Sequence, residues 1–532
     1  MSTVDDKTVV TALRSDLPAL LPDFLRDRRW FAGKARKIEA IQILDVISMP
    51  IENPSVFLAM SKITYSSGLK EIYDIPLALA PALTSAVADS AQIMEIDLCD
   101  SNGALQLSDA MSEPRFLELL LDIIRANSSF AGSKGELHAR AGKSFAEFWD
   151  PGEPRLIPRL NRGEQSNSSV FYGRKLILKL FRRLEPGINP DLEIGSFLTE
   201  KTSFRNIAPV LGRLEYLRGG NHISIGILQA FVANQGDAWE FTLQKVEEFF
   251  RGGAADKNAP LNLNRSILEL SEREIPTEAA GIIGEYLDWA KLLGRRTAEL
   301  HLALASDSND RDFRPEAFTD ADQREFRHGA EQLLRSTFQL LRDQCSFLPL
   351  DIRESAEVVL GQEGYLKKRL DNFESSHLSV TKTRIHGDYH LGQVLFTGSD
   401  FVIIDFEGEP SRPLAERRRK RSPLQDVAGM LRSFDYAAHT TLGKGFQGGE
   451  RKQMEITATY WQKWVSAAFL RSYREVAAGA GFVPKSQPEF ELMLEAFLLD
   501  KAVYELAYEL NNRPAWVRTP LGGISQLLEN AA

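Results

Sequence analysis

The sequence contains little cysteine and no long apolar run. Its two cysteines, Cys99 and Cys345, lie far apart, so neither a disulfide framework nor a cysteine metal site is indicated. No apolar stretch approaches the ~18 residues that a membrane helix needs. The first residues also lack the basic and apolar regions of a secretory signal. We therefore expect a cytoplasmic protein that does not enter a membrane.

An excess of positive charge is also missing. The chain of 532 residues has 64 Lys and Arg against 73 Asp and Glu, which gives a formal net charge of −9. A dominant nucleic-acid partner would favour a basic face, so we expect none. The length predicts two to four domains, and 43% hydrophobic residues can supply sizeable cores.

The most informative segment is a loop followed by two short β-prone runs. Residues 384–393 read Arg-Ile-His-Gly-Asp-Tyr-His-Leu-Gly-Gln, and an apolar run then ends at Asp405. Phosphoryl transfer uses one carboxylate to orient and deprotonate the attacking hydroxyl, and further oxygens to hold Mg²⁺ on ATP. This pattern predicts Asp388 as the catalytic residue and Gln393 and Asp405 as magnesium ligands, which a hairpin would bring together. The alternative is a hairpin with incidental surface acids.

A nucleotide-binding region is predicted before this loop, where the sequence becomes β-rich. Ser166, Asn167 and Ser168 form a small-residue loop that can cradle phosphates through amides and hydroxyls, although the signal is weak by itself. Lys179 interrupts an apolar strand, as the phosphate-binding lysine of kinases does. Glu193 stands in the first turns of a helix that starts at Asn189-Pro190, and it can pair with Lys179. The alternative is a strand-edge lysine and a solvated glutamate.

Gln229 and Phe231 follow the last predicted strand of this region. Their position suits a hinge whose backbone reads the adenine edge of ATP. A helix is expected from 236 to about 250, and the second half of the chain is otherwise mostly helical. The other predicted helices cover 277–304, 320–345, 352–375, 453–478 and 488–510.

Four parts of the chain are expected. They are a small α+β cap (1–110), a connecting helix and linker (111–155), a β-rich nucleotide-binding lobe (156–235) and a helical catalytic and acceptor-binding lobe (236–532). In the cap we predict a helix over 8–25 and strands over 41–47, 56–63 and 70–75. The segment 28–34 mixes two aromatics with several cations. We expect Trp30 and Phe31 to anchor the cap while the cations stay solvated, rather than an anion site.

Several segments together resemble the bacterial maltokinases, including the kinase parts fused to trehalose synthase. The segments that carry the resemblance are 29–34, 293–301, the loop around Asp388 with 405–410, the tract 417–434, and 500–505. The resemblance implies an α+β fold of the bilobal, protein-kinase-like (aminoglycoside phosphotransferase-like) type with an N-terminal cap. It also implies ATP-dependent phosphorylation of the anomeric hydroxyl of maltose, in glycogen and trehalose metabolism, with a trehalose synthase as an expected partner.

The resemblance also directs attention to the helix near residue 500. Lys501, Tyr504 and Tyr508 share one helix face, since they lie at i, i+3 and i+7. The residues alone favour core tyrosines and a simple ion pair. The resemblance makes Asp500, Lys501 and Tyr504 candidates for binding the sugar. His390 lies two residues after Asp388 and can also reach the acceptor.

Two further features surround the predicted site. Asp426 is expected to anchor the catalytic loop by hydrogen bonds. The basic run 417–421 is expected to pair with nearby acids such as Glu407 and Glu409, or to meet anionic ligands.

Two other functions stay open from the sequence. One is a related kinase for glucosamine or an aminoglycoside. The other is a silent nucleotide-binding module that regulates a trehalose-synthase partner. The intact set of Asp388, Gln393 and Asp405 argues against the silent module.

Overall fold

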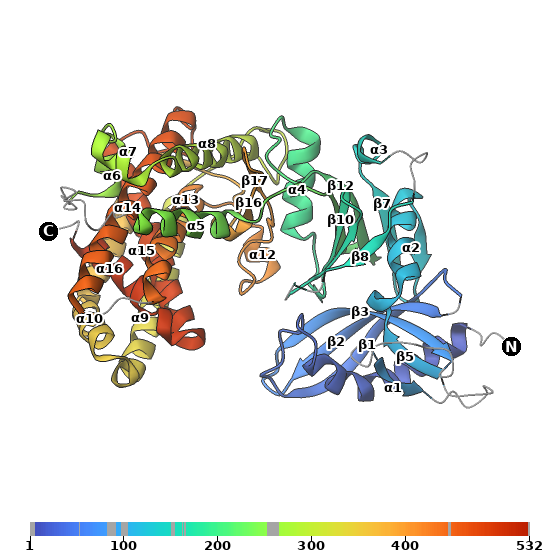
Figure 1. Cartoon of the computed structure of the whole chain (residues 1–532). Helices are drawn as coiled ribbons and strands as arrows, with labels where there is room; N and C mark the ends of the chain where they lie inside the picture. Colours follow the sequence, from blue (N-terminus) through green and yellow to red (C-terminus); the bar gives the residue numbers. More distant parts are fainter. Residues whose placement is uncertain are drawn as a thin grey trace. The chain divides into compact units, whose positions relative to one another are not determined.

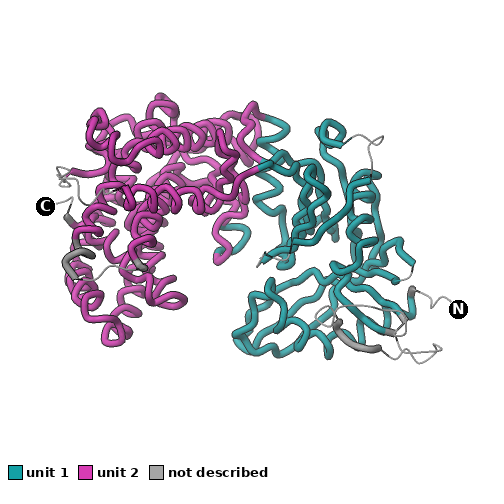
Figure 2. Tube along the Cα trace, viewed as in Figure 1, with its two compact units in different colours: residues 1–201, 208–233, 412–416 teal, residues 202–207, 234–411, 417–532 magenta. Residues whose placement is uncertain are grey.

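The computed structural model describes residues 6–52, 54–81, 92–96, 105–149, 155–161, 163, 166–252, 265–444 and 448–529. The described chain divides into two compact units, coloured separately in Figure 2. Unit 1 comprises 1–201, 208–233 and 412–416, and unit 2 comprises 202–207, 234–411 and 417–532. Cys99, Gln165, Pro151-Gly152 and residues 253–264 of the polar insert lie outside the described residues.

The first part of unit 1 is a helix packed on an antiparallel sheet (Figure 1). The strand order is β1-β2-β3-β5-β4, and β11 pairs with β3 at a separate point. The elements are α1 (Asp6–Arg26), β1 (Ile38–Met49), β2 (Ser55–Tyr65), β3 (Lys70–Pro81), β4 (Gln92–Ile96), β5 (Leu105–Asp109), η1 (Ala110–Ser112) and β11 (Arg183–Leu184). The predicted helix and the three predicted strands of the cap are confirmed.

The core of this cap follows from the spacing of apolar residues on α1. Val9, Leu13, Leu17 and Leu21 recur every four residues and are all buried against the sheet. Phe31 is buried in the same core, and its ring lies 5.2 Å from that of Tyr73. The two aromatics of segment 28–34 therefore anchor the cap, as predicted.

A second sheet of seven strands forms the rest of unit 1. Its order is β6-β7-β12-β13-β10-β9-β8. The elements are α2 (Pro114–Arg125), β6 (Ser129–Ala131), β7 (Glu136–Ala141), α3 (Phe145–Phe148), β8 (Pro158–Leu160), β9 (Ser168–Tyr172), β10 (Leu176–Leu180), α4 (Pro190–Lys201), β12 (Val210–Arg218) and β13 (Asn221–Ala230). The prediction of a linker over 111–155 missed β6 and β7, because the turn between these short strands has the composition of a linker.

Asp45 explains that turn. Its buried carboxylate accepts hydrogen bonds from the amides of Ser133, Lys134 and Gly135 at 2.9, 3.0 and 3.1 Å, and from the hydroxyl of Tyr216 at 2.8 Å. Burial raises the pKa of Asp45, but these hydrogen bonds outweigh it and the net pKa is below its ordinary value. One strand of the cap sheet therefore holds the hairpin of the second sheet.

Asp74, on β3, is a second buried acid, and its pKa is shifted in the opposite direction to that of Asp45. It is 1% exposed, and neither carboxylate oxygen has a hydrogen-bond partner. Burial raises the pKa of Asp74 from its ordinary 3.8 to about 7. Between these two pH values the folded chain keeps a proton that the unfolded chain loses. The free energy of unfolding should therefore fall as pH rises through this window, by about 1.4 kcal/mol per pH unit.

We expect Asp74→Asn to remove this loss, because an amide cannot ionise. The variant should melt at a higher temperature than the wild type at pH 7.5 and at nearly the same temperature at pH 4.5. Thermal melts of both proteins across this range measure the effect. A variant that melts at a lower temperature at pH 7.5 would show that the ionised carboxylate stabilises the fold.

Unit 2 is mainly helical. Its helices are α5 (Ala238–Arg251), α6 (Ile267–Ser271), α7 (Thr277–Ile283), α8 (Tyr286–Leu304), α9 (Asp320–Gln344), η2 (Cys345–Phe347), α10 (Leu350–Gly361), α11 (Glu363–Ser375), η3 (Leu391–Gln393), α13 (Leu424–Thr440), η4 (Thr441–Lys444), α14 (Gly448–Val476), α15 (Gln487–Asn512), η5 (Pro514–Trp516) and α16 (Arg518–Glu529). Its strands form two short ladders, β14 (Glu316–Ala317) with β15 (Thr381–Lys382) and β16 (Val394–Phe396) with β17 (Phe401–Ile403). α12 (Leu414–Arg417) lies where the chain passes between the units.

The helix predictions are confirmed with two differences. The stretch 277–304 is two helices, because Gly284 has φ +73° and ends the first of them. The stretch 352–375 is also divided, with a break at Gln362. α13 was not predicted as a helix, and it buries the polar residues Asp426, Arg432 and Asp435 together with its apolar ones.

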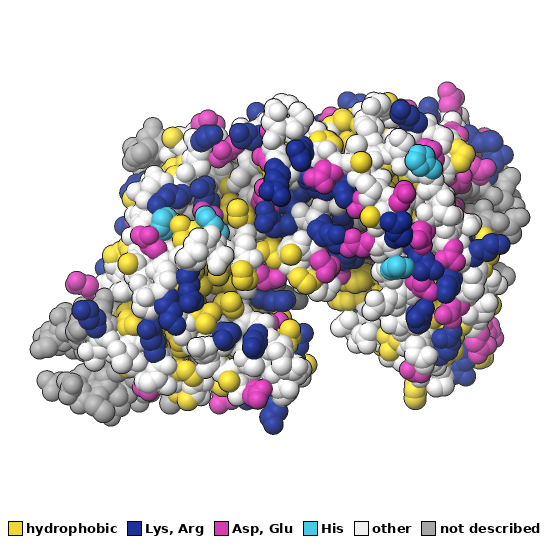
Figure 3. All heavy atoms as spheres, turned by 180° about the vertical axis from the view of Figure 1, so that it is seen from behind, with side chains coloured by type: hydrophobic (Ala, Val, Ile, Leu, Met, Phe, Trp, Pro, Cys, Tyr) yellow, Lys and Arg dark blue, Asp and Glu magenta, His cyan; other side chains and the backbone are white. Residues whose placement is uncertain are grey.

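Within the described ranges, no helix combines the length and the apolar character that crossing a membrane requires. On the face drawn in Figure 3, Lys and Arg side chains are intermixed with Asp and Glu, so neither sign of charge covers that face alone.

Candidate active site

The predicted catalytic loop of unit 2, residues 384–393, runs from β15 to the β16–β17 hairpin. The hairpin has the predicted form, with Val394 opposite Ile403 and Phe396 opposite Phe401. The amide of Ile404 donates to the carbonyl of Gln393 at 3.0 Å. The backbones of Gln393 and Asp405 therefore lie at the same open end of the hairpin, as the sequence predicted.

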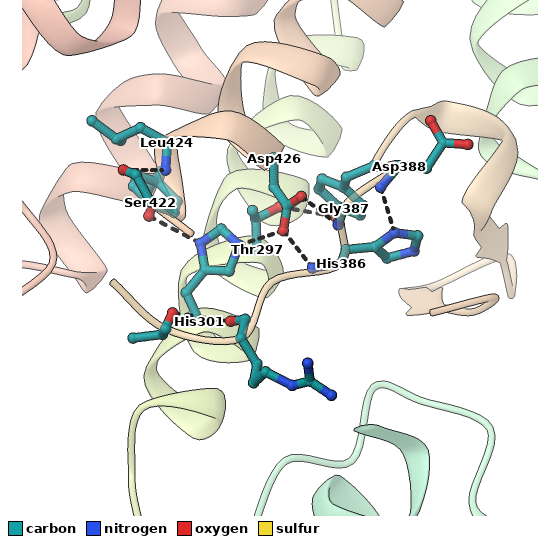
Figure 4. Close-up of polar contacts among 12 residues, drawn as sticks. Thr297, His301, His386, Gly387, Asp388, Ser422, Leu424 and Asp426 are labelled. Atoms are coloured by element: carbon teal, nitrogen blue, oxygen red, sulfur yellow. Dashed lines mark hydrogen bonds and ion pairs between the residues drawn. The ribbon is translucent and has the colours of Figure 1, made fainter. Parts of the chain in front are cut away.

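Asp426, at the start of α13, holds the loop just before Asp388 (Figure 4). One carboxylate oxygen accepts from the amide of His386 at 2.8 Å and the other from the amide of Gly387 at 2.9 Å. Burial raises the pKa of Asp426. Its hydrogen bond with His301 and the nearby histidines and amides outweigh this effect, so the net pKa is below its ordinary value and the carboxylate is ionised. The predicted anchoring role of Asp426 is confirmed.

α8 supports the same loop from a second direction. His301 Nε2 lies 3.0 Å from Asp426 Oδ2, and its Nδ1 lies 3.0 Å from the hydroxyl of Tyr473. One turn earlier, the hydroxyl of Thr297 lies 2.9 Å from that of Tyr389. The preceding residue, Arg296, donates two hydrogen bonds to Asp400 in the hairpin turn, at 2.9 and 2.7 Å. Contacts from this stretch of α8 therefore fix both the loop and the hairpin.

Close helix packing completes this support. A Cβ atom on Gly429 of α13 would lie 2.5 Å from the carbonyl oxygen of Tyr389, inside contact distance of the loop backbone. On α8, a Cβ atom on Gly294 would lie 2.2 Å from the carbonyl oxygen of Phe469 on α14. Only glycine permits these approaches, so both positions help to set the position of the catalytic loop.

Asp388 lies beside the helix face that was predicted to bind the sugar. Lys501 Nζ is 3.5 Å from Asp388 Oδ1. Burial lowers the pKa of Lys501, but the charges of Asp388, Glu505 and Glu409 raise it above its ordinary value, so Lys501 is a cation. One turn further along α15, Tyr504 has a raised pKa, through burial and then through the charge and hydrogen bond of Glu409. Asp500, the third candidate on this helix, is partly buried.

His390 lies in the same region and is neutral. Burial lowers its pKa, and the opposing charge of Asp388 does not restore it. Its Nδ1 accepts from the amide of Gly392 at 3.1 Å, so the ring carries its proton on Nε2. His390 can therefore donate a hydrogen bond to a ligand oxygen.

The predicted magnesium ligands fit a hard cation. Gln393 offers an amide oxygen, and Asp405 and Glu407 offer carboxylate oxygens that lie within 4.8 Å of one another. Asp405 has φ +65°, a conformation that a non-glycine residue adopts rarely. Glu407 was not among the predicted ligands, and its position two residues after Asp405 is the signal that identifies it.

The basic run pairs largely with acids of unit 2, as expected. Arg417 Nη1 donates to the carbonyl of Glu407 at 3.0 Å and lies 3.9 Å from its carboxylate. Lys420 donates to Glu316 at 2.6 Å, and Arg419 pairs with Glu325. The Arg417 contact confirms the predicted pairing with Glu407.

Unit 1 brings Lys179 and the start of α4 together. Lys179 lies on β10, between Ser169 of β9 and Ile227 of β13. Its ammonium is 3.3 Å from the carboxylate of Asp191, which is buried in the first turn of α4. Asp191 was not predicted for this role, and the pairing of Glu193 with Lys179 stays a prediction. Both acids stand in the same turn, so spacing along the chain could not distinguish them.

The loop and hinge candidates lie in, or directly beside, strands β9 and β13 of the same sheet. Ser166 is exposed and Asn167 partly buried, whereas Ser168 is buried at the start of β9. Gln229 of β13 stands opposite Ile177 of β10. The amide of Phe231 donates to the carbonyl of Lys175 at 2.7 Å. The amide of Phe231 is therefore already engaged, and an adenine edge bound at this predicted hinge would have to use other backbone groups near residues 229–231.

Comparisons with known proteins agree with this arrangement. Residues 24–112 match the maltokinase N-terminal cap domain. A glucosamine kinase of Streptacidiphilus jiangxiensis is 22% identical over 372 residues, which are 69% of this chain and 72% of that protein. A glucosamine kinase of Mycolicibacterium smegmatis is 28% identical over 247 residues, which are 46% of this chain and 54% of that protein.

Solved structures give the same fold. A glucosamine kinase in complex with glucosamine, ADP and inorganic phosphate aligns with a TM-score of 0.61 and 17% identity, over 98% of this chain and 99% of that one. A second crystal form of glucosamine kinase gives a TM-score of 0.62 with 16% identity, over 98% and 99% of the two chains.

The cap match and the shared fold define the architecture of the chain. The chain has an α+β, kinase-like fold with an added N-terminal cap. Residues 24–112 are similar to the maltokinase cap, and the whole chain is similar in fold to glucosamine kinase.

Proposed function

We propose that this protein is a sugar kinase that transfers the γ-phosphoryl group of ATP to the anomeric hydroxyl of maltose. The support for phosphoryl transfer is the catalytic loop of unit 2. Asp388 follows a backbone that Asp426 holds by two amide hydrogen bonds, and Gln393 and Asp405 lie at the end of the adjoining hairpin. This order of parts is the one that kinases use.

In the proposed reaction, Asp388 orients the sugar hydroxyl and accepts its proton. The sugar oxygen then bonds to the γ-phosphorus while the bond to the β-phosphate oxygen breaks and ADP leaves. Asp405, Gln393 and Glu407 would hold Mg²⁺, which when bound neutralises charge on the phosphates. Lys179, positioned by Asp191, can bind phosphate oxygens. Lys501 and Tyr504 can donate hydrogen bonds to sugar hydroxyls.

The observation that carries the choice of a neutral sugar is the contact between Lys501 and Asp388. A cation 3.5 Å from the catalytic carboxylate disfavours an acceptor that brings its own ammonium group to the same place. The maltokinase-type cap over 24–112 also supports maltose. A trehalose synthase as partner remains part of this proposal and rests on the resemblance in sequence.

Glucosamine is the second candidate acceptor. Both curated relatives named above are glucosamine kinases. Glu409 also lies near Tyr504 and accepts a hydrogen bond from Ser411 at 2.5 Å, so an acid is available to an amino group.

An acceptor screen tests the proposal. The protein is incubated with ATP, Mg²⁺ and one of maltose, glucosamine, glucose or kanamycin, and ADP release is followed. We expect ADP release to depend on maltose. Release with glucosamine and none with maltose would assign the second candidate, and ATP binding without turnover on any acceptor would favour the silent module.

Substitutions on α15 test the acceptor face. We expect Lys501→Ala and Tyr504→Ala each to raise the KM for the sugar with little change in the KM for ATP. Loss of one hydrogen bond costs about 0.5–1.5 kcal/mol, or roughly 2- to 13-fold in affinity. Tyr508→Ala is the matched control, because Tyr508 is on the same helix face but 45% exposed. If the melting temperature falls while the sugar KM of the folded enzyme stays constant, this face belongs to the core.

A further inference from the structure

Arg432 is a buried arginine of α13 that the proposed mechanism does not use. It is 5% exposed, and a Cβ atom on Gly523 of α16 would overlap its Nη1, so the helices close tightly around the guanidinium. A buried guanidinium requires acidic partners, because removal of a charge from water is costly without them. Arg432 has two such partners, which lie on two different helices.

One partner lies on α13 itself. Nη1 of Arg432 donates to Asp435 Oδ2 at 2.5 Å, and the other carboxylate oxygen of Asp435 lies 3.0 Å from Nδ1 of His439. Asp435 is 2% exposed, so these contacts are shielded from water. One side of the guanidinium is therefore fixed within its own helix, and its opposite side reaches α15.

The other partner is Glu505 on α15, one turn after Lys501. Nε of Arg432 donates to Glu505 Oε2 at 2.8 Å, and Nη2 lies at the same distance from that oxygen. Residues four apart share a helix face, so the carboxylate that Arg432 holds is a neighbour of Lys501. Burial lowers the pKa of Lys501, but the charges of Asp388 and then of Glu505 raise it above its ordinary value.

Lys501 therefore lies beside two acids whose positions both depend on α13. Asp426, at the start of α13, holds the amides just before Asp388. Arg432, six residues later on the same helix, holds Glu505. Lys501 Nζ is 3.5 Å from Asp388 Oδ1, which is longer than the about 2.7–2.9 Å of a close charge-assisted hydrogen bond. An ammonium that shares its charge with a second acid leaves the first acid available to a hydroxyl.

We propose that Glu505 is a positioning residue which, held by Arg432, keeps Lys501 directed to the acceptor and prevents it from closing onto Asp388. This inference rests on the proposed function, since that function assigns Lys501 to the sugar and Asp388 to the attacking hydroxyl. It gives α13 a second role besides anchoring the catalytic loop. The helix sets the positions of the general base and of the cation beside it.

The test is the effect of Glu505→Gln on the kinetics with maltose. Glutamine keeps the shape of the side chain and can still accept from Arg432, but it has no charge to share with Lys501. Lys501 should then pair more closely with Asp388 and compete with the sugar hydroxyl for that carboxylate. We expect kcat/KM for maltose to fall about 2- to 13-fold, the range for one lost interaction, with the KM for ATP unchanged.

Glu509→Gln is the matched control. Glu509 is a buried acid one turn further along α15, and it accepts from Arg513 at 2.8 and 3.0 Å. Both variants remove one buried charge from an arginine, so both should lower the melting temperature, but the control should keep the wild-type kinetics. A Glu505→Gln enzyme that differs from the wild type in melting temperature alone would overturn the inference.

Arg432→Lys tests the contribution of α13. Lysine keeps the charge but lacks the planar fork with which arginine spans two acids. We expect kcat/KM for maltose to fall in the folded variant while the KM for ATP stays constant. Wild-type kinetics in this variant would refute the role of Arg432.

A double-mutant cycle with Lys501→Ala makes the test specific. If Glu505 acts through Lys501, adding Glu505→Gln to Lys501→Ala should not lower kcat/KM for maltose any further. Fully additive losses would contradict the inference. Wild-type protein that turns over no maltose would refute the proposed function, whereas equal kcat/KM of the wild type and Glu505→Gln would refute only the role of Glu505.

Discussion

Asp388→Asn is expected to lower kcat by roughly 10²- to 10⁴-fold, the usual contribution of a positioned general base. The amide keeps the shape of the side chain but cannot take the proton of the attacking hydroxyl. Asp388 lies 3.5 Å from Lys501, which is proposed to bind the sugar. Loss of the Asp388 carboxylate should therefore change the chemical step more than nucleotide binding. Steady-state kinetics with ATP and maltose, together with nucleotide binding by fluorescence, measure both effects.

The same substitution affects Lys501 as a secondary consequence. Asp388 is the largest of the charges that raise the pKa of Lys501, so the pKa of that ammonium should fall in the variant. The pH dependence of sugar binding would then move to lower pH, while the loss of kcat persists at every pH. A residual rate within about threefold of the wild type would remove Asp388 from the catalytic role.

Asp426→Ala is expected to produce the largest combined loss of activity and stability. Its carboxylate accepts from the amides of His386 and Gly387 and contacts Nε2 of His301, and truncation leaves these buried groups without their partner. Each unsatisfied buried donor costs about 1–3 kcal/mol, so a total of at least about 3 kcal/mol is expected. The loop that carries Asp388 should lose its fixed conformation, and kcat should fall with the melting temperature.

Asp288→Ala on α8 is a suitable control for this prediction. The Asp288 side chain is 80% exposed and pairs with Lys291 at the surface, so its loss should be nearly neutral. Thermal melts and kinetics of both variants compare a buried acid with an exposed one. An Asp426→Ala enzyme with the melting temperature and kcat of the control would show that the loop does not depend on this anchor.

The sequence predicted the parts of the site that are close together in the chain. Asp388, Gln393 and Asp405 lie within one loop and one hairpin, and their spacing was sufficient to predict the hairpin. The role of Asp426 was also predicted. The supports from α8 were not, because Arg296 meets Asp400 and His301 meets Asp426 across more than a hundred residues of chain. Local spacing carries no information on such contacts.

Other differences have equally local causes. Asp191 and Glu193 share one helical turn, and only the folded geometry gives Asp191 its contact with Lys179. β6 and β7 were missed because they are short and joined by a turn rich in small residues, which Asp45 fixes from another sheet. The composition of this segment therefore indicated a linker. The structure has a hairpin there, because the carboxylate of Asp45, distant in sequence, binds the amides of its turn.

The most direct test of the central claim is to identify the product by ³¹P NMR. Protein, ATP, Mg²⁺ and maltose are incubated, and the new phosphate signal is examined for coupling to a sugar proton. We predict one phosphomonoester whose phosphorus couples to the anomeric proton of maltose, formed in equal amount to ADP. Inorganic phosphate without a sugar ester, or an ester coupled to any other sugar proton, would contradict the proposed function.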